Sequence, residues 1–564
     1  MQHNSPMLSA LRMLTVTLLL GFSGTAALAD EESSQVSEHL EAAEIALQGM
    51  DYLVAAREYR LAAELSDDVE VAIRATSVTS TLGLNEDALA AARRWLKLDE
   101  DSDEALFYVA RFELRNGNMR AAKRRYRQLL EAGDEEPDRR LLSLIGVLGE
   151  EDAEAGNEIM QTLARPYRDS PYAKYAAAVM SLQADDLDTA REQAMEAIEM
   201  EPDPWLLDKA KLLYGRILLV AGETDEAIDY VARIIGDDPQ PAPDARMELA
   251  LIMMSAGRND DALSQVNQVL LENSNNFDAL RLMAIINFRE GNLDAAWEDF
   301  EDLLSTRQHT MDALYYLARI SDFREESERA IRLYSQVRSG SHTVTSQRRA
   351  AALIAFTRED EEAALAHLDN FASTNPALGV DMVQAKAQLL AALDRYDESL
   401  EYYDLLIQYR PDSEGVMLGR GELLLRMDRL DDAIEQYRAA VRRYPDSAIS
   451  LNALGYTLAD RTDRYREAER LIRKALELNP DSSAIIDSMG WVLFKLGRHE
   501  EALVELRRAY EGLEDAEVAA HIVEVLAVLD RREEALEFLV EAEEKFPESP
   551  LLEDVRERMF PEAD

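Results

Sequence analysis

Apolar residues recur along this chain at the spacing of amphipathic helices, in short blocks separated by polar turns. Two consecutive blocks near the C-terminus show the spacing, and their apolar residues are Leu451, Leu454, Leu458, Ala468, Leu471, Ile472, Ala475 and Leu476. Because residues three or four apart share one face of a helix, each block predicts a helix with one buried face. The pattern therefore predicts an all-α protein built from helix-turn-helix units.

Small residues mark one position on each helix of the predicted hairpins. On the second helices they are Ala55, Ala88, Ala122, Ala155, Ala190, Ala227, Ala262, Ala296, Ala330, Ala364, Ser399, Ala433, Ala468, Ala502 and Ala535. On the first helices they are Ala43, Thr76, Ala110, Ser143, Ala178, Gly215, Ala250, Ala284, Ala318, Ala352, Ala387, Gly421, Gly455, Gly490 and Val523. The mean period is about 34 residues, which indicates a repeat array. Small side chains let two helix axes approach closely, so we expect each pair of markers to lie where the axes cross.

Proline marks the joints between hairpins in the C-terminal third. Pro411, Pro445 and Pro480 are each followed by Asp-Ser. Proline ends one helix and Asp or Ser caps the next one. This unit resembles the tetratricopeptide repeat, most closely between residues 380 and 547 and least between 136 and 166. The resemblance implies a right-handed superhelical solenoid with a concave inner face.

The repeats divide into two predicted arrays. Residues 30–235 make an N-terminal array of about six partly degenerate repeats, and residues 244–564 a C-terminal array of about nine. Residues 236–243 separate them as a Pro-rich joint, because three prolines within five residues cannot lie inside a helix.

The first 29 residues differ from the rest of the chain. Arg12 precedes a short apolar run, and a small-x-small sequence ends at Ala29 before the acidic Asp30. This is the pattern of a secretory signal peptide, and the alternative is an uncleaved N-terminal anchor. Cleavage near Ala29-Asp30 predicts a periplasmic or secreted protein, and no later segment is apolar enough to cross a bilayer.

Composition excludes several classes of partner. The chain has 61 Lys+Arg against 110 Asp+Glu, a formal net charge of -49. This charge argues against nucleic acids and anionic lipids, which are bound through cations. Cysteine is absent, so the chain has no disulfide, thiolate metal site or N-terminal lipid anchor on Cys. A surface rich in acid and poor in Lys is typical of proteins adapted to salt.

No catalytic constellation is found in the sequence. The seven His residues include no metalloprotease spacing, and there is no nucleophile elbow or phosphate-binding loop. The segment 99–103 begins like a calcium loop, but it lacks the Gly at position six and the Glu at position twelve. We therefore expect no catalytic residues, no metal site and no cofactor.

One basic segment stands out from the acidic chain, running from Arg111 to Arg127. Within it, Arg120, Arg124 and Arg127 share one helix face, which could dock an acidic partner. The alternative is that these cations pair with Asp and Glu of neighbouring repeats.

Aromatic residues fall into two groups. Those four places after the second-helix marker are expected to be core, and they include Tyr59, Tyr126, Phe300, Tyr334, Tyr403 and Tyr437. The resemblance implies that first-helix positions around the small residue line the inner surface. In the C-terminal repeats these positions hold Asn452, Tyr456, Trp491, Phe494 and Lys495. Trp491 and Phe494 would be anchors for a bound peptide, and the alternative is that they pack on the adjacent helix.

The segments 451–462 and 487–492 resemble the C-terminal repeats of proteobacterial tetratricopeptide lipoproteins, which include the adaptor of a periplasmic carboxyl-terminal processing protease. The resemblance implies a non-enzymatic scaffold that binds proteins or peptides in its groove and delivers substrates to a serine-type protease. The missing lipidation Cys departs from that pattern. An alternative function is a scaffold in exopolysaccharide or envelope assembly.

Overall fold

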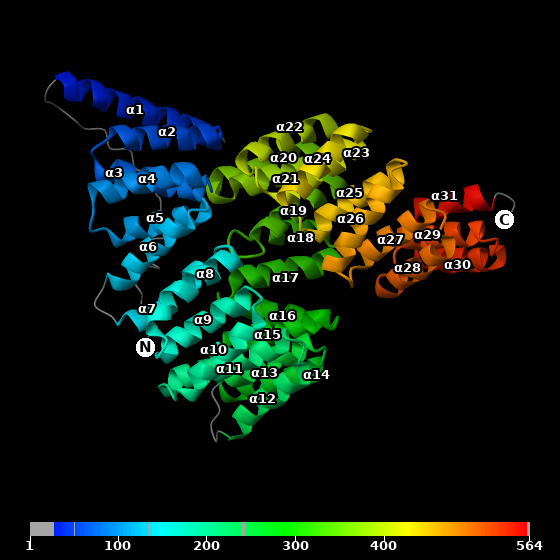
Figure 1. The fold of residues 1–564 in the computed structure, drawn as a ribbon, viewed down its shortest axis with the longest axis horizontal. Helices are drawn as coiled ribbons and strands as arrows, with labels where there is room; N and C mark the ends of the chain where they lie inside the picture. Colours follow the sequence, from blue (N-terminus) through cyan, green and yellow to red (C-terminus); the bar gives the residue numbers. More distant parts are fainter. Residues whose placement is uncertain (1–26, 50, 133–135, 238–242, 561–564) are drawn as a thin grey trace. The chain divides into compact units, whose positions relative to one another are not determined.

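The computed structural model describes residues 27–49, 51–132, 136–237 and 243–560, and over these residues the chain is helical with no β-strand. Contacts divide the chain into two compact units, 1–217 and 218–564, and each is described by itself. Short 3-10 helices lie at Arg165–Tyr167 and Pro376–Leu378. The all-α repeat architecture predicted from the sequence is confirmed (Figure 1).

The helices of the first unit are α1 (Ala27–Gln48), α2 (Tyr52–Leu65), α3 (Val69–Thr81), α4 (Asn85–Leu98), α5 (Asp103–Arg115), α6 (Met119–Glu131), α7 (Pro137–Leu148), α8 (Ala153–Ala164), α9 (Pro171–Gln183), α10 (Leu187–Glu199) and the greater part of α11 (Pro204–Val220). The helices of the second unit are α12 (Thr224–Asp237), α13 (Pro243–Ser255), α14 (Asn259–Glu272), α15 (Phe277–Arg289), α16 (Leu293–Ser305), α17 (Thr310–Phe323), α18 (Ser327–Tyr334), α19 (Thr343–Thr357), α20 (Glu361–Thr374), α21 (Gly379–Ala392), α22 (Tyr396–Tyr409), α23 (Glu414–Arg426), α24 (Leu430–Arg443), α25 (Ala448–Arg461), α26 (Tyr465–Leu478), α27 (Ser483–Lys495), α28 (His499–Gly512), α29 (Ala516–Val528), α30 (Arg532–Lys545) and α31 (Pro550–Met559).

Odd-numbered and even-numbered helices alternate as the first and second helices of hairpins. The first-helix markers of the sequence fall on odd-numbered helices from α1 to α29, and the second-helix markers fall on even-numbered ones. The predicted signal peptide, 1–29, and the Pro-rich joint, 236–243, lie largely outside the described residues, and both stay predictions.

Side chains and turn residues fix where the helices start and stop. The Ser102 hydroxyl accepts a hydrogen bond from the Ala105 N–H at 3.1 Å, and Ser447 does the same for Ser450 at 3.2 Å. These bonds satisfy backbone donors that a helix start leaves free. Between the helices of most hairpins the chain passes through a left-handed residue, such as Gly291 at φ 76° or Gly497 at φ 78°, where glycine is favoured.

The glycine markers lie where the two helices of a hairpin touch. A Cβ atom added to Gly455 would lie 2.6 Å from Ile472 Cγ1, and one added to Gly490 would lie 2.5 Å from Leu506 Cγ. At Gly421 an added Cβ would overlap the ring of Tyr437. The contacted residue stands four places after the second-helix marker in each case. The predicted close approach of the helices is therefore confirmed at these hairpins.

The core aromatics are also confirmed. The predicted aromatic residues that follow the second-helix marker by four places are all buried, namely Tyr59, Tyr126, Phe300, Tyr334, Tyr403 and Tyr437. Each lies on the second helix of its hairpin, and four residues make about one helical turn, so it shares the buried face of the marker.

The fourth hairpin, α7 and α8, departs from the predicted register. Ser143 is exposed and Ala155 is half-buried, so neither is the packed small residue. Gly156 takes that role on α8, because an added Cβ would lie 2.7 Å from the Leu148 carbonyl oxygen and 3.0 Å from Met180 Cε. Instead of packing mainly on each other, α7 packs on α9 and α8 on both α6 and α9. The altered packing explains why the repeat pattern is weakest here.

The register also slips by one residue in α19. The predicted marker Ala352 is half-buried, whereas Ala351 is buried. The Asp360 N–H donates to the Ile354 carbonyl six residues back, while the equivalent bond in α15, from Asn292 to Asn287, spans five. One extra residue at the end of α19 therefore moves the packed position back to Ala351.

Ion pairs join the turn of one hairpin to the second helix of the hairpin before it. The pairs are Arg324–Asp294 at 2.5 Å, Arg358–Glu328 at 2.6 Å and Arg498–Glu469 at 2.9 Å. These pairs, about one repeat apart in sequence, repeat the same link between neighbours along the second unit.

Candidate protein-binding surfaces

Trp491, the predicted aromatic anchor on α27, is buried, with 5% of its surface exposed. Its ring stacks on His521 of α29 with the centroids 3.9 Å apart. The indole N–H donates to Asp460 Oδ1 of α25 at 3.3 Å. Trp491 thus packs between neighbouring first helices, as the packing alternative expected. The reason is that the next repeat places an aromatic ring over the position that would otherwise open to the groove.

Phe494 and Lys495 are half-buried around the same indole ring. The Phe494 ring lies 5.3 Å from Trp491 and 5.3 Å from His499. Lys495 Nζ lies 4.2 Å from the centroid of the Trp491 ring, which is cation–π distance. Both residues keep some exposed surface, so they border the cluster on its solvent side.

Tyr456 and Asn452 lie on α25 and complete the set of inner-surface residues. The Tyr456 hydroxyl donates to Glu517 Oε1 of α29 at 2.5 Å. Burial raises the pKa of the Tyr456 phenol, and the hydrogen bond and charge of Glu517 raise it further. Asn452 is half-buried, and its Oδ1 is buried without a hydrogen-bond partner. The five predicted residues therefore lie on α25 and α27, two first helices that are in contact.

The sequence reasoning missed two buried polar residues of this cluster. His521 Nδ1 lies 2.9 Å from Asp487 Oδ1, and both side chains are less than 10% exposed. The repeat register offered a signal for Asp487, because it precedes Gly490 by three places as Asn452 precedes Gly455. A buried His–Asp pair joins α27 to α29 and is strongly directional.

Two exposed phenylalanines were also missed. Phe323 ends α17 with 77% of its surface exposed, and Phe356 lies near the end of α19 with 53% exposed. Each follows the packed small residue of its helix, Ala318 or Ala351, by five places. The resemblance implies that this position lines the inner surface, and the register correction in α19 gives the two phenylalanines the same position.

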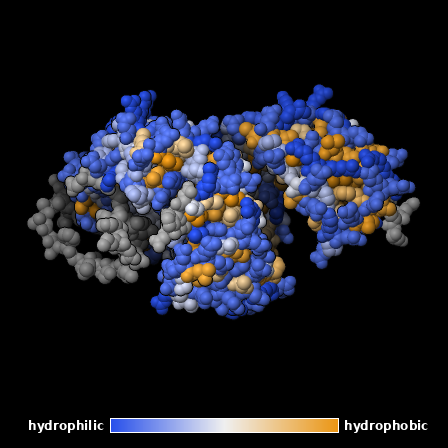
Figure 2. Space-filling model, turned by 90° about the horizontal axis from the view of Figure 1, so that it is seen from below, coloured by the Kyte–Doolittle hydropathy of each residue, from blue (hydrophilic) through white to orange (hydrophobic). Residues whose placement is uncertain are grey.

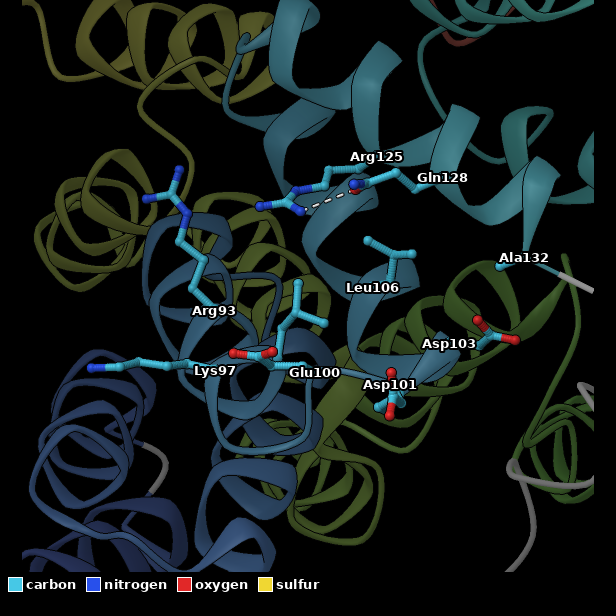
Figure 3. A pocket seen from close by; sticks show the side chains of 11 residues that line it. Arg93, Lys97, Glu100, Asp101, Asp103, Leu106, Arg125, Gln128 and Ala132 are labelled. Carbon is cyan, nitrogen blue, oxygen red and sulfur yellow. Dashed lines mark hydrogen bonds between the residues drawn. The ribbon is translucent and has the colours of Figure 1, made fainter.

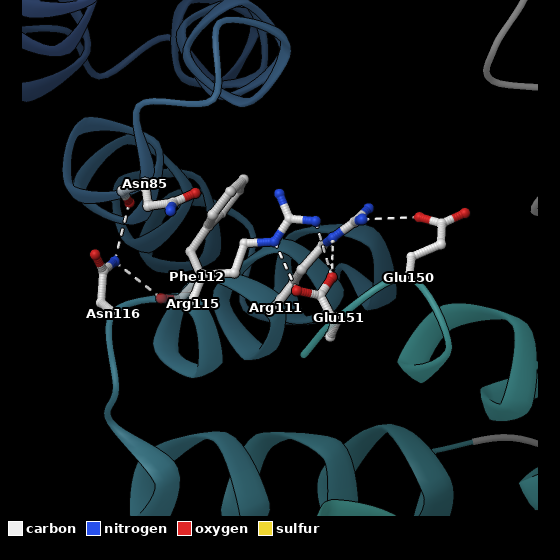
Figure 4. Close-up of polar contacts among 7 residues, drawn as sticks. All are labelled: Asn85, Arg111, Phe112, Arg115, Asn116, Glu150 and Glu151. Carbon is white, nitrogen blue, oxygen red and sulfur yellow. Dashed lines mark hydrogen bonds and ion pairs between the residues drawn. The ribbon is translucent and has the colours of Figure 1, made fainter. Parts of the chain in front are cut away.

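The basic segment lies on α5 and α6, and part of it pairs with the next hairpin. Arg111 Nε and Arg115 Nε each lie 2.7 Å from the carboxylate of Glu151, whose side chain is 3% exposed (Figure 4). Lys123 Nζ lies 2.6 Å from Glu158 of α8. For these cations the pairing alternative is correct, since they hold the third hairpin against the fourth.

The three arginines predicted to form a docking face on α6 are not paired in this way. Arg120, Arg124 and Arg127 are exposed, and within the described residues no carboxylate pairs with any of them. Their spacing of four and three residues places them on one side of the helix, opposite the buried Tyr126. The pairing alternative does not apply to these three residues.

A cavity of about 600 Å³ lies beside α6 (Figure 3). Its lining residues are Arg93, Leu96, Lys97, Glu100, Asp101, Ser102, Asp103, Leu106, Arg125, Gln128 and Ala132. The acidic segment 99–103 links α4 to α5, and in the described part of the chain no group of His, Asp and Glu has the arrangement of a metal site. In the same described residues, no helix is both long enough and apolar enough to span a membrane.

Hydrophilic side chains cover most of the surface visible in Figure 2, with smaller apolar patches among them. This distribution accords with a charged fraction of 30% and the excess of acid over base.

Family models identify the repeats in parts of the chain. Three models described as tetratricopeptide repeat match the chain. The first matches residues 182–242, 418–483 and 457–517, the second matches 218–286, and the third matches 380–413. The chain therefore contains tetratricopeptide repeats, and its helices form a solenoid of that kind.

Among characterised sequences, the chain is similar to the TPR repeat-containing protein PA4667 of Pseudomonas aeruginosa, with 28% identity over 216 residues. The match covers 38% of this chain and 36% of that protein. Solved structures that the chain matches include the APC/C hetero-tetramer Cut9-Hcn1 (15% identity, TM-score 0.34, 94% of this chain and 97% of that one) and yeast Tom70 (14%, 0.35, 93% and 96%). A third is Naa15/Naa10 bound to HypK-THB (13%, 0.37, 94% and 96%).

Proposed function

We propose that this protein is a non-enzymatic scaffold of an exported compartment that binds a polypeptide along its first-helix face and delivers it to a carboxyl-terminal processing protease. The observation that carries the proposal is the pair of exposed phenylalanines, Phe323 and Phe356, at the same register position on consecutive first helices. An exposed aromatic ring keeps apolar surface in contact with water, and a binding partner would remove that contact. Aromatic side chains are common anchors in protein interfaces.

The charged groups beside the phenylalanines fit a polypeptide ligand. The guanidinium of Arg319, one position after the packed residue on α17, is exposed and lies 4.7 Å from the centroid of Phe288. Arg349 of α19 makes two hydrogen bonds to Asp322 of α17, at 2.6 and 2.8 Å, next to Phe323. This bridge holds the two first helices together while the phenylalanine ring stays exposed.

The experiment is a pull-down from a periplasmic extract with the full chain as bait. We expect the wild type to retain a serine-type processing protease or its substrates, and Phe323→Ser with Phe356→Ser to lose them. The matched control is Leu271→Ser with Val504→Ser, because these side chains are 86% and 66% exposed but lie on second helices. Equal retention by both variants, or recovery of polysaccharide-export proteins alone, contradicts the proposal.

A reconstituted assay tests delivery itself. Purified protease should cleave its substrate faster with the wild-type protein than without it. The double phenylalanine variant should fall back to the rate of protease alone, because cleavage then depends on unassisted encounter. An unchanged rate on adding the wild-type protein would remove the adaptor role.

A further inference from the structure

The cationic face of α6 is defined as Arg120, Arg124 and Arg127. Every other cation of the basic segment has a partner in the chain: Arg111, Arg115 and Lys123 reach carboxylates of the next hairpin, and Arg125 reaches Gln128 at 3.0 Å. The cationic face makes no such contact in the described structure, although the chain carries 110 acidic residues. Packing therefore gives no reason for three unpaired arginines on one side of a helix.

The adjoining cavity carries charges of both signs. Arg93, Lys97 and Arg125 line the cavity that borders α6, but Glu100, Asp101 and Asp103 line it too and Arg93 pairs with Glu113, so the cavity adds no net positive charge. Arg125 Nε is buried without a hydrogen-bond partner. A buried guanidinium nitrogen without an acceptor costs free energy that a ligand oxygen would recover. The unpaired positive charge of this surface therefore lies on the cationic face of α6.

We propose that this surface docks an acidic peptide segment of a partner protein. The arginines of the cationic face span seven residues, about 10 Å along the helix, so they match carboxylates spread over a similar length. Guanidinium groups bind carboxylates through paired hydrogen bonds, and at physiological salt charges are felt over only about 8 Å. A local basic patch can therefore attract an acidic segment although the whole chain is negative.

Net charge decides between this occupant and the others. A nucleic acid or an anionic vesicle presents a long array of negative charge, which a chain of formal charge -49 repels beyond the patch. A second copy of this chain carries the same charge and is repelled likewise. A short acidic segment avoids most of that repulsion because it fits within the patch.

The proposal deepens the proposed protein-binding function by naming the chemistry of one partner segment, but it uses a different surface from the phenylalanines. Failure here with the pull-down intact would remove only the α6 site. Failure of the pull-down with peptide binding intact would remove the groove function and leave this site.

The test measures binding of a fluorescein-labelled octaglutamate to the full chain by fluorescence anisotropy. The variant Arg120→Gln, Arg124→Gln, Arg127→Gln should bind about tenfold more weakly, from three exposed ion pairs of about 0.5 kcal/mol each. The control Arg426→Gln, Arg429→Gln, Arg442→Gln changes the net charge equally but removes arginines already paired with Glu422, Asp432 and Glu435. The control should bind like the wild type.

Four further outcomes decide the proposal. Octaglutamine should not bind, and 500 mM salt should weaken octaglutamate binding, because the contact is electrostatic. Tighter binding of single-stranded DNA or of phosphatidylserine vesicles than of octaglutamate would overturn the choice of a peptide. Equal loss in both triple variants would show a net-charge effect and overturn the site.

Discussion

At the residue scale, three glycines mark close contacts between the two helices of a hairpin. Gly421, Gly455 and Gly490 each face a large side chain of the second helix at a distance that leaves no room for a methyl group. Glycine is otherwise unfavourable inside a helix by about 1 kcal/mol relative to alanine. At these positions the need for close packing outweighs the helix propensity.

Replacing Gly421 by alanine should therefore destabilise the protein. The new methyl group would overlap the Tyr437 ring, and overpacking of this kind costs about 1–3 kcal/mol, more than the propensity gain. Gly415 lies in the same helix with no atom within 4 Å of an added Cβ, so Gly415→Ala should be neutral or slightly stabilising. Urea unfolding followed by circular dichroism measures both. A more stable Gly421→Ala variant would show that the ring moves without cost.

At the element scale, the sequence was sufficient for the helices and for most of their register. The same pattern recurs in fourteen or fifteen repeats, so its period can be found in the sequence, and the markers fall on the expected helices. The slip in α19 could not be seen, because Ala350, Ala351 and Ala352 are consecutive and any of them satisfies the pattern. Only the extra residue before Asp360 selects Ala351.

The candidate site shows the same limit. The repeat register placed Trp491 and Tyr456 at inner positions. It did not show which side chains of a following repeat would cover these positions. His521 and Glu517 of α29 cover those positions in the structure. Conversely, Phe323 and Phe356 were overlooked because the inner-surface prediction covered only the C-terminal repeats, where the resemblance is closest.

The α19 correction has a direct test at the same scale. Ala351→Leu should destabilise the protein by about 1–3 kcal/mol, because the buried position is already filled. Ala352→Leu should cost much less, since that position is half-buried. Thermal melts of the two variants rank them. The opposite order would restore the register read from the sequence.

At the scale of the whole molecule, charge is the dominant property. A formal charge of -49 produces self-repulsion in any compact state, and salt screens it. The ion pairs between hairpins are mostly exposed and each contributes less than about 1 kcal/mol, so their weakening by salt is a smaller effect.

We therefore expect the melting temperature to rise as sodium chloride is increased from 20 to 500 mM. Potassium chloride should give the same rise, because the effect is screening and not specific binding of an ion. Differential scanning fluorimetry provides the measurement. A melting temperature that falls over this range would mean that the ion pairs, and not the net charge, govern stability.

The links between consecutive hairpins have a consequence for folding kinetics. Pairs such as Arg324–Asp294 and Arg358–Glu328 join residues only 30 positions apart. Each of these contacts closes a short segment of chain, so the ends of the polypeptide need not meet before a stable nucleus forms. Folding can start in any well-packed hairpin and spread to its neighbours, and the rate should depend little on how many repeats the chain carries.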